Sequence, residues 1–339
     1  MRRNTKNESR KKRKVFMAIL MTLFTGLILT GSAYAWFTAN QKVTVSTLDV
    51  NVAAENGLQV SVDGNDWKAI VSKADIDGAT ATYPTNTNQL PWATGKNLSP
   101  VSTVGEVENG KLKMFSGKVD AEAGTGTLKL TATRATEQKG DVGQFVAFDL
   151  FFKVDKDSQI KISKGSDVTA KDTDKGLKNS ARVAWLVEGN AANGTALNTI
   201  QGLSTTSNTD TGSIASGATN LMVWEPNADL HTATAKAHVA SNYPGTDLTA
   251  IPVAMKGVKA EINTPQALNS SDPLYFDTVK GTQVNSKATD GIADNTMWFH
   301  LKQGITKVRF YLWIEGQDVD CENTASGSAI NFNMAFEIA

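Results

Sequence analysis

Alternation of apolar and polar side chains is the main pattern of this 339-residue chain. It is clearest in residues 307–315 and 329–339, where an apolar side chain recurs at every second position. A period of two is typical of a β-strand with one face in the core. A large apolar side chain stabilises the fold by roughly 1.5–3 kcal/mol when fully buried, so these two strands are predicted to lie in the core. The same alternation occurs in residues 58–62, 144–154 and 181–187, and in residues 42–52 with a phase shift at Thr47 that suggests a bulge or a break.

The segments between these strands have the composition of turns and loops. Asp63-Gly64 is a strong hairpin signal, with a return strand over residues 67–71. Two stretches near residues 75–125 and 189–220 are rich in Gly, Asn, Thr and Ser. They have turn chemistry and little periodicity, so they are predicted to be long insertions at the surface.

Helical patterns are scarce in the sequence. A short helix fits residues 233–241, and no long amphipathic helix is predicted. Several short strands joined by irregular loops indicate an all-β fold. We therefore predict an antiparallel, jelly-roll-like β-sandwich with long loop insertions and few short helices.

The first 35 residues have the three parts of a secretory signal peptide. Eight basic residues are followed by the uncharged apolar run of residues 15–30, and Ala33 and Ala35 form the A-x-A site that a signal peptidase recognises. Cleavage after Ala35 leaves Trp36 as the new N-terminus. Residues 36–339 are then predicted to form a single exported domain.

A retained membrane anchor is the alternative interpretation of the same segment. The chain carries no charge from residue 15 to residue 37, which is long enough to cross a bilayer with some tilt. Cleavage predicts a protein of the extracellular matrix or cell surface, whereas retention predicts a membrane-anchored one.

Removal of the signal peptide leaves a net negative chain. The signal peptide contains eight of the 34 basic residues and one of the 34 acidic residues, so 26 positive charges face 33 negative ones, a net charge of −7. This charge argues against nucleic-acid binding, which needs a basic surface. The single cysteine, Cys321, allows no intramolecular disulfide, and export without disulfides is typical of a bacterial surface protein.

The sequence lacks the motifs of common hydrolases and nucleotide-binding enzymes. The three histidines form no H-E-x-x-H pair, and neither G-x-S-x-G nor a glycine-rich phosphate loop occurs. Cys321 lies between Asp320 and Glu322, whose charges raise the pKa of its thiol and disfavour the nucleophilic thiolate. Cys321 is therefore predicted to be a packed thiol, and no catalytic residue is predicted.

The acidic segment of residues 315–323 is the first candidate binding site. Its carboxylates belong to Glu315, Asp318, Asp320 and Glu322. The last three alternate along the chain, so an extended segment would direct them the same way, and converging oxygen ligands suit calcium. A solvated acidic loop is the alternative, because the full twelve-residue calcium-loop pattern is absent.

Trp224-Glu225-Pro226-Asn227, with His231 shortly after it, is the second candidate site. Pro226 is expected to end a strand, and Asn227 favours a turn. Glu225 and His231 are predicted to form a ligand or metal site. The alternative is a loop held in place by packing of Trp224 on the sandwich.

Four parts of the chain together resemble a known family. They are residues 33–38 around the cleavage site, Leu48-Asp49-Val50, Trp224-Glu225-Pro226-Asn227, and the C-terminal block of residues 313–321, W-I-E-G-Q-D-V-D-C. The match is to the camelysin/TasA family of exported proteins from Gram-positive bacteria, which a dedicated SipW-type signal peptidase processes. The long insertions match no pattern of that family.

The resemblance implies a jelly-roll fold and assembly into extracellular fibres of the biofilm matrix. In such fibres an N-terminal segment of one subunit completes the sheet of the next, and residues 42–52 are extended and close to the cleavage site, as such pairing requires. We predict strand donation between copies of this chain; an ordinary first strand is the alternative. The candidate donated side chains are Val43, Val45, Leu48, Val50 and Val52. Other matrix proteins and cell-wall components are further candidate partners.

Two other functions stay open. The camelysin name implies a metallo-endopeptidase, although the zinc-protease motif is absent. A surface adhesin or glycan-binding module would need exposed aromatic side chains, and the candidates are Trp67, Trp92 and Trp313.

Overall fold

The computed structural model describes eleven segments of the chain, all from residue 50 onward. They are residues 50–55, 57–92, 98–125, 128–163, 166–171, 173–208, 220–242, 256–267, 275–284, 298–321 and 327–338. Several residues of the sequence predictions lie outside these segments. They are the signal-peptidase residues Ala33, Ala35 and Trp36, the donor residues Val43, Val45 and Leu48, and the candidate ligand Glu322.

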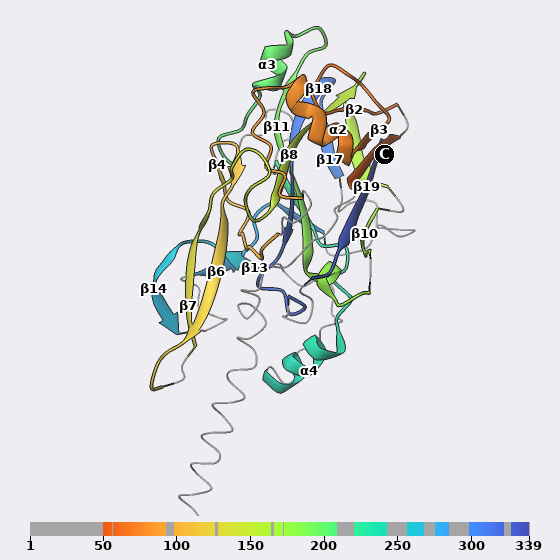
Figure 1. Ribbon diagram of the computed structural model, residues 1–339. Coiled ribbons are helices and arrows are strands. Elements are labelled where there is room, and N and C mark those ends of the chain that lie inside the picture. The colour runs from red at the N-terminus through yellow and green to blue at the C-terminus, as the bar shows by residue number, and fades with distance from the viewer. Residues whose placement is uncertain are drawn as a thin grey trace, which may run out of the picture.

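Two six-stranded sheets form the two layers of a sandwich (Figure 1). Sheet A has the order β17-β9-β19-β1-β3, with β10 also paired to β19. Its strands are β1 (Val50–Glu55), β3 (Ile70–Ser72), β9 (Ser158–Ile162), β10 (Asp167–Ala170), β17 (Trp298–Leu301) and β19 (Ile330–Ile338). Sheet B has the order β16-β12-β11-β18-β8-β2. Its strands are β2 (Gln59–Ser61), β8 (Val146–Val154), β11 (Ala181–Ala191), β12 (Leu221–Trp224), β16 (Thr282–Val284) and β18 (Gly304–Ile314).

The main core lies between the two sheets. Alternate apolar side chains of β8, β11 and β18 pack against those of β1 and β19. Phe336 of β19 meets Trp185 of β11 and Phe310 of β18 edge to face, with ring centroids 5.7 and 5.8 Å apart. Such aromatic pairs add about 0.5–1.5 kcal/mol each to the stabilisation from burial. The prediction that the last two strands lie in the core is therefore confirmed, with one strand in each sheet.

The other face of sheet B is also buried, which the alternation does not indicate. All eleven residues of β18 are buried. The insertion predicted near residues 75–125 covers this face: Leu112 and Met114 pack against the apolar side chains on it, and the Leu112 N–H donates to the Tyr311 hydroxyl. A strand covered on both faces must place its charged side chains against partners, because unpaired charges are costly away from water.

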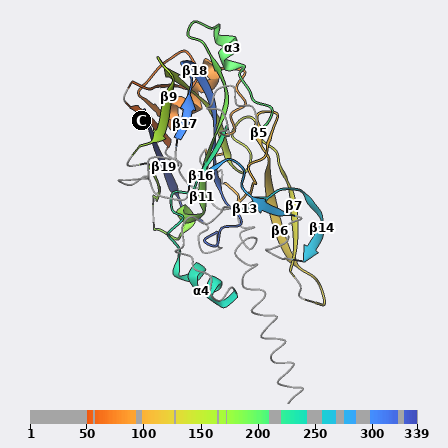
Figure 2. The same ribbon diagram turned by 180° about the vertical axis from the view of Figure 1, so that it is seen from behind.

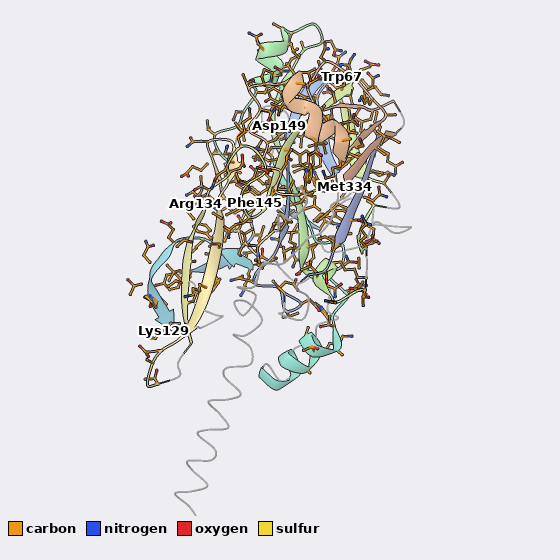
Figure 3. All side chains as sticks on the ribbon, viewed as in Figure 1. Trp67, Lys129, Arg134, Phe145, Asp149 and Met334 are labelled. Carbon is orange, nitrogen blue, oxygen red and sulfur yellow. The ribbon has the colours of Figure 1, made fainter. Side chains whose placement is uncertain are left out.

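Three smaller sheets complete the β structure. A wing of three strands, in the order β14-β7-β6, extends from the sandwich (Figure 2). Its strands are β6 (Met114–Ala121), β7 (Leu128–Ala135) and β14 (Ile262–Ala267). The two-stranded sheets are formed by β4 (Val107–Glu108) with β5 (Lys111–Leu112) and by β13 (Lys256–Val258) with β15 (Phe276–Thr278). In Figure 3, Lys129 marks the far part of the wing, whereas Asp149 lies within the body of the sandwich.

The described helices are short. They are α2 (Lys73–Gly78), α3 (Leu197–Gln201), α4 (Ala233–Asn242) and the 3₁₀ turns η2 (Ala79–Ala81) and η3 (Leu177–Ser180). The predicted helix over residues 233–241 is confirmed by α4, which lies at the opposite end of the sandwich from α3 (Figure 1). Within the described segments, no helix has the length and apolar character needed to span a membrane.

The predicted all-β fold with few short helices is confirmed, and the strand order adds two parallel pairs. β1 runs parallel to β19 and β12 runs parallel to β16, while the other pairs are antiparallel. The jelly-roll topology stays a prediction. Because Val50 lies opposite Phe332, near the start of β19, the chain enters sheet A at the end where β19 begins.

Two side chains do not have the exposure that the adhesin hypothesis assumed. Trp92 is 5 % exposed and Trp313 is 1 % exposed, so neither presents a ring to solvent. Trp92 packs beside Phe148, and its indole N–H donates to Asp77 at 2.6 Å. Trp67 is half-buried. Trp313 lies on the face of sheet B that the insertion covers, whereas Trp92 belongs to a segment predicted as a surface insertion and packs into the main core.

Candidate functional site

The two candidate sites of the sequence come together as one buried polar cluster. Its members, which we call the Arg182 cluster, are Arg182, Glu225, His231, Glu315, Asp318 and Asp320. Strand pairing explains the convergence: β11 begins beside the ends of β12 and β18, with Val183 opposite Trp224 and Ala181 opposite Ile314. Residues that directly follow β12 and β18 therefore gather around the first residues of β11.

Arg182 is the centre of this cluster. Its Nη2 lies 2.7 Å from Oε1 of Glu225 and 2.5 Å from Oδ2 of Asp318. Its Nη1 donates to the carbonyl oxygens of Asn179 and Ala181, both at 3.2 Å. Burial disfavours the charge of Arg182, but the surrounding carboxylates outweigh this effect and raise the pKa of its guanidinium. The positive charge of Arg182 therefore forms ion pairs with carboxylates from two different loops.

Asp320 connects the turn after β18 to the start of α4. Its Oδ2 lies 2.7 Å from Nδ1 of His231, and its Oδ1 accepts the Thr232 N–H at 2.7 Å. The Thr232 hydroxyl in turn accepts the Ala235 N–H in the first turn of the helix, at 3.0 Å. Gly176 makes room for this contact, because it has φ +92° and a methyl group there would overlap the Thr232 side chain. One carboxylate therefore positions the arm that carries α4.

Glu315 and Glu225 are the two carboxyls of the cluster whose pKa values are raised. Glu315 accepts the Trp313 indole N–H at 3.1 Å and the Gln317 N–H at 3.2 Å. Burial raises the pKa of both carboxyls to about 7, and Arg182 only partly opposes this shift. Burial also raises the pKa of the Cys321 thiol well above its usual value. The cluster can therefore exchange protons near neutral pH, and its thiol is a poor nucleophile, as the sequence predicted.

The described carboxylates already have protein partners in place of a metal. Asp318 pairs with Arg182, and Asp320 pairs with His231. Among the described residues, no group of three His, Cys, Asp or Glu side chains is arranged to hold a metal ion. Calcium binding stays a prediction, because Glu322 lies outside the described segments. Glu225 and His231 belong to the same cluster but reach it through different partners, Arg182 and Asp320.

The donor-strand prediction falls partly on described residues. Val50 and Val52 lie in β1, and Val52 is fully buried in the core. β1 pairs with β19 on one side and with β3 on the other, both within the same chain. These two residues are thus used within their own subunit, and only the preceding segment remains a candidate for donation.

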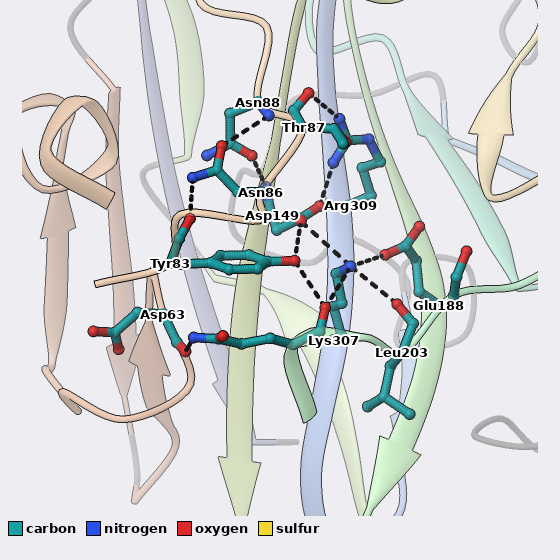
Figure 4. Close-up of polar contacts among 12 residues, drawn as sticks. Asp63, Tyr83, Asn86, Thr87, Asn88, Asp149, Glu188, Leu203, Lys307 and Arg309 are labelled. Carbon is teal, nitrogen blue, oxygen red and sulfur yellow. Dashed lines mark hydrogen bonds and ion pairs between the residues drawn. The ribbon is translucent and has the colours of Figure 1, made fainter. Parts of the chain in front are cut away.

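A second buried charge cluster lies on the covered face of sheet B (Figure 4). Its members, which we call the Arg309 cluster, are Tyr83, Glu137, Asp149, Glu188, Lys307 and Arg309. Arg309 forms ion pairs with Asp149 and with Glu137, whose side chains are 1 % and 2 % exposed. Lys111 adds a third positive charge, 2.9 Å from Glu137. Three positive side chains thus face three carboxylates.

Lys307 joins this cluster to the loop after α3. Four oxygen atoms of the described residues surround its Nζ within 3.3 Å, from Asp149, Glu188 and the carbonyls of Gln201 and Leu203. Burial disfavours its charge, but the carboxylates outweigh this effect and raise the pKa of its ammonium group. Burial raises the pKa of the Asp149 carboxyl, but the positive charges of Arg309 and Lys307 outweigh this effect and hold that pKa below its usual value. Asp149 and Lys307 therefore stay ionised. They hold Tyr83 of the insertion and Leu203 of the loop after α3 against sheet B.

Sequence reasoning did not single out the Arg309 cluster, although a signal for it exists. Lys307 and Arg309 occupy alternate positions of β18, which is otherwise largely apolar, and Asp149 interrupts the apolar run of β8. The register places Arg309 opposite Asp149. A charge in each of two strands that are otherwise apolar indicates a buried ion pair, provided that the two strands are neighbours. That last condition is known only from the fold.

Comparison with known proteins adds no assignment: no family model, curated protein or solved structure matches the chain.

Proposed function

We propose that this chain is an exported structural protein that self-associates outside the cell, with residues 36–49 as the segment that pairs with a neighbouring copy. The observation that carries the proposal is the pairing of β1, which is held on both sides by β19 and β3 of its own chain. The sandwich is therefore closed at β1 without the segment that precedes it. A strand-like arm attached to an interior strand can leave its own subunit without opening the core.

The sequence of the segment that precedes β1 also supports self-association. Residues 42–46 alternate apolar and polar side chains before the phase shifts at Thr47, and edge pairing requires little more than an extended segment of this kind. The resemblance to the camelysin/TasA family, with its fibres and its processed N-terminus, points the same way. A signal peptide still attached to Trp36 would hinder donation, so processing is expected to precede assembly.

Electron microscopy of protein that begins at Trp36 tests self-association. Filaments of uniform width are expected, and dispersed single particles across pH and salt would reject the proposal. Protein that lacks residues 36–47 is expected to stay monomeric and folded. If that protein forms equally good filaments, donation is wrong and self-association through another surface remains.

A matched pair of variants tests which face of the arm packs against the neighbouring copy. Val43→Lys/Val45→Lys places two charges on the apolar face, whereas Thr44→Lys/Ser46→Lys places the same two charges on the opposite face. Only the first variant is expected to abolish filaments, because a donated strand buries one face against its acceptor. Equal loss in both variants would indicate a general charge effect.

A further inference from the structure

We propose that the outer edge of β6, in the three-stranded wing, is the surface that accepts residues 42–46 of a neighbouring copy. This inference rests on the proposed function, because it names the partner strand for the arm of residues 36–49. The acceptor is thus placed on the wing and not on either sheet of the sandwich.

The outer edge of β6 is the longest regular strand edge that lacks a partner among the described strands. Phe115 exchanges two backbone hydrogen bonds with Ser102, at 2.8 and 2.9 Å. Beyond Phe115 the strand continues to Ala121, and no other described residue pairs with that side. Because backbone groups alternate in direction along a strand, Gly117, Val119 and Ala121 direct their N–H and C=O groups outward, as Phe115 does. Another extended segment can therefore pair with this edge.

The other described strand edges are shorter or blocked. Apart from β14, the remaining edge strands have two to four residues. β14 has six residues, but it contains Pro265, and its pairing with β7 shifts register between Ile262 and Gln266. A proline and an irregular register both prevent further strand pairing. Among the described edges, only that of β6 combines length with a regular backbone.

The two faces of the wing differ in polarity. On one face the side chains are buried and apolar, and they belong to Phe115, Leu130, Ala132 and Ile262. On the opposite face they are polar and at least partly exposed, and they belong to Ser116, Lys118, Thr131 and Thr133. A strand added at β6 extends both faces, so its side chains must alternate in the same way.

The arm has the alternation that this edge requires. Val43 and Val45 lie on one face of an extended segment, and Thr44 and Ser46 lie on the other. Pairing with β6 places the two valines beside the apolar cluster of the wing and the two hydroxyls beside its polar face. The opposite arrangement would leave both valines in water. The wing therefore accounts for the face of the arm that becomes buried.

The position and length of the arm also fit this acceptor. The arm joins β1 at the end of the sandwich where β19 begins, and β6 runs toward the same end, opposite the C mark (Figures 1 and 2). Fully extended, residues 36–49 reach about 46 Å, whereas residues 116–121 of the β6 edge span about 20 Å. The arm can thus cover this edge and still bridge two copies. In a filament whose copies share one orientation, the arm runs antiparallel to β6.

Disulfide cross-linking between two variants of the protein that begins at Trp36 tests the acceptor. One variant is Thr44→Cys, on the polar face of the arm. Its partner is Ser116→Cys or Lys118→Cys, on the polar face of β6, and Thr264→Cys is the matched control because it is exposed on the other edge of the same wing. The native Cys321 is buried and stays in place.

The variants are mixed during filament growth, oxidised mildly and separated on a non-reducing gel. Arm-to-wing links are expected with the β6 variants at about tenfold or more the yield of Thr264→Cys, because two cysteines can be bridged only when their Cα atoms lie within about 7 Å. Mass spectrometry of the linked peptides separates arm-to-wing links from arm-to-arm links. Since the two thiols are on different chains, each such link joins two copies.

Val119→Pro is an independent test of the same edge. The substitution removes one outward N–H of β6 and leaves the hydrogen bonds to β7 in place. The protein concentration needed for filaments is expected to rise by about tenfold or more. Circular dichroism and thermal unfolding verify that this variant is folded, and if it is not, the cross-links alone decide.

The outcomes separate this inference from the proposed function. If the parent protein forms filaments but β6 gives no more links than Thr264→Cys, the acceptor is wrong and self-association stands. The same conclusion follows if folded Val119→Pro forms filaments as readily as the parent. If Thr44→Cys/Lys118→Cys on one chain gives a linked monomer and the mixture gives no dimer, the arm pairs with its own wing and the inference is overturned. A parent protein without filaments rejects the proposed function and this inference together.

Discussion

Two buried charge clusters on the same face of sheet B differ in their balance of charge. In the Arg309 cluster, three positive side chains face three carboxylates, and the loop cover closes over them. In the Arg182 cluster, four carboxylates share one guanidinium and one imidazole at the end of the sheet. In the balanced cluster only Glu188 has a pKa of about 7, and the ion pairs of Arg309 keep their charges near neutral pH. In the acid-rich cluster two of the four carboxyls, Glu225 and Glu315, have pKa values of about 7, so its charge depends more strongly on pH. The difference lies in the number of partners and not in the depth of burial.

The largest expected effect comes from removing the central arginine of each cluster. Arg309→Met leaves Asp149 and Glu137 buried without their main partner and is expected to lower the free energy of unfolding by about 3–5 kcal/mol at both about pH 5.5 and pH 8. Arg182→Met is expected to cost clearly less at the lower pH, because Glu225 can then be neutral. Urea unfolding at the two pH values measures both variants. An identical pH response would show that the two clusters do not differ as proposed.

The pH profile of the unmodified protein is the second prediction. Glu188, Glu225 and Glu315 have pKa values of about 7 in the folded state against an ordinary 4.5, so their contribution to stability is present below about pH 4.5 and is lost as the pH rises through 7. Asp149 and Asp75 have lowered pKa values, so their contribution is lost as the pH falls below 4. The free energy of unfolding is therefore expected to be highest at about pH 4–5 and to fall as the pH rises through 7. A maximum at pH 8 would contradict these assignments.

Glu225→Gln/Glu315→Gln sharpens this profile. Because both carboxyls ionise in the folded state only at a cost, the double variant is expected to gain about 1–3 kcal/mol at pH 8 and almost nothing at pH 5. Chemical unfolding at the two pH values measures the gain. A double variant that is less stable than the parent at pH 8 would mean that the ionised carboxylates stabilise this end of the sheet.

A glycine pair separates backbone strain from packing at the Arg182 cluster. Gly176 and Gly194 both have positive φ, +92° and +86°, but a methyl group would overlap Thr232 at the first position and meet no atom within 4 Å at the second. Gly194→Ala is expected to cost about 1 kcal/mol and Gly176→Ala about 1–3 kcal/mol. Thermal unfolding compares the two. Equal costs would show that the contact between Gly176 and Thr232 contributes little.

Tyr83→Phe has the smallest expected effect. The Tyr83 hydroxyl donates to the Gln201 carbonyl at 2.8 Å and contacts Asp149 Oδ2 at 3.0 Å, so it links the cover to the Arg309 cluster. Removing the hydroxyl is expected to cost about 1 kcal/mol, because Arg309 and Lys307 still satisfy Asp149. A loss as large as that of Arg309→Met would mean that the hydroxyl, and not the arginine, holds the cluster together.

The sequence predicted the strands of the sandwich well because their signal is local. Alternation in residues 144–154, 181–187, 307–315 and 329–339 corresponds to β8, β11, β18 and β19. The same local signal was misleading for Trp313, which alternation assigned to the outer face and which the structure buries at 1 % exposure. Period-two patterns report which side chains share a face, and they do not report whether a distant loop covers that face.

The sequence also identified five residues of the Arg182 cluster, but as two unrelated sites. Glu225 and His231 come from one motif, and Glu315, Asp318 and Asp320 come from another. Arg182 was not predicted, because an arginine at the start of a strand has no local signature. Its role depends on the pairing of β11 with both β12 and β18.

The amino-acid sequence by itself determined which segments become strands, which of their faces enters the core, and where acidic groups are concentrated. These properties depend on residues within a few positions of each other along the chain. Only the tertiary structure decided that the second face of sheet B is covered, that Arg309 meets Asp149, and that Arg182 is shared by two loops. Those outcomes depend on strand order, which brings together residues far apart in the chain, and on burial, which makes the balance of charge between them decisive.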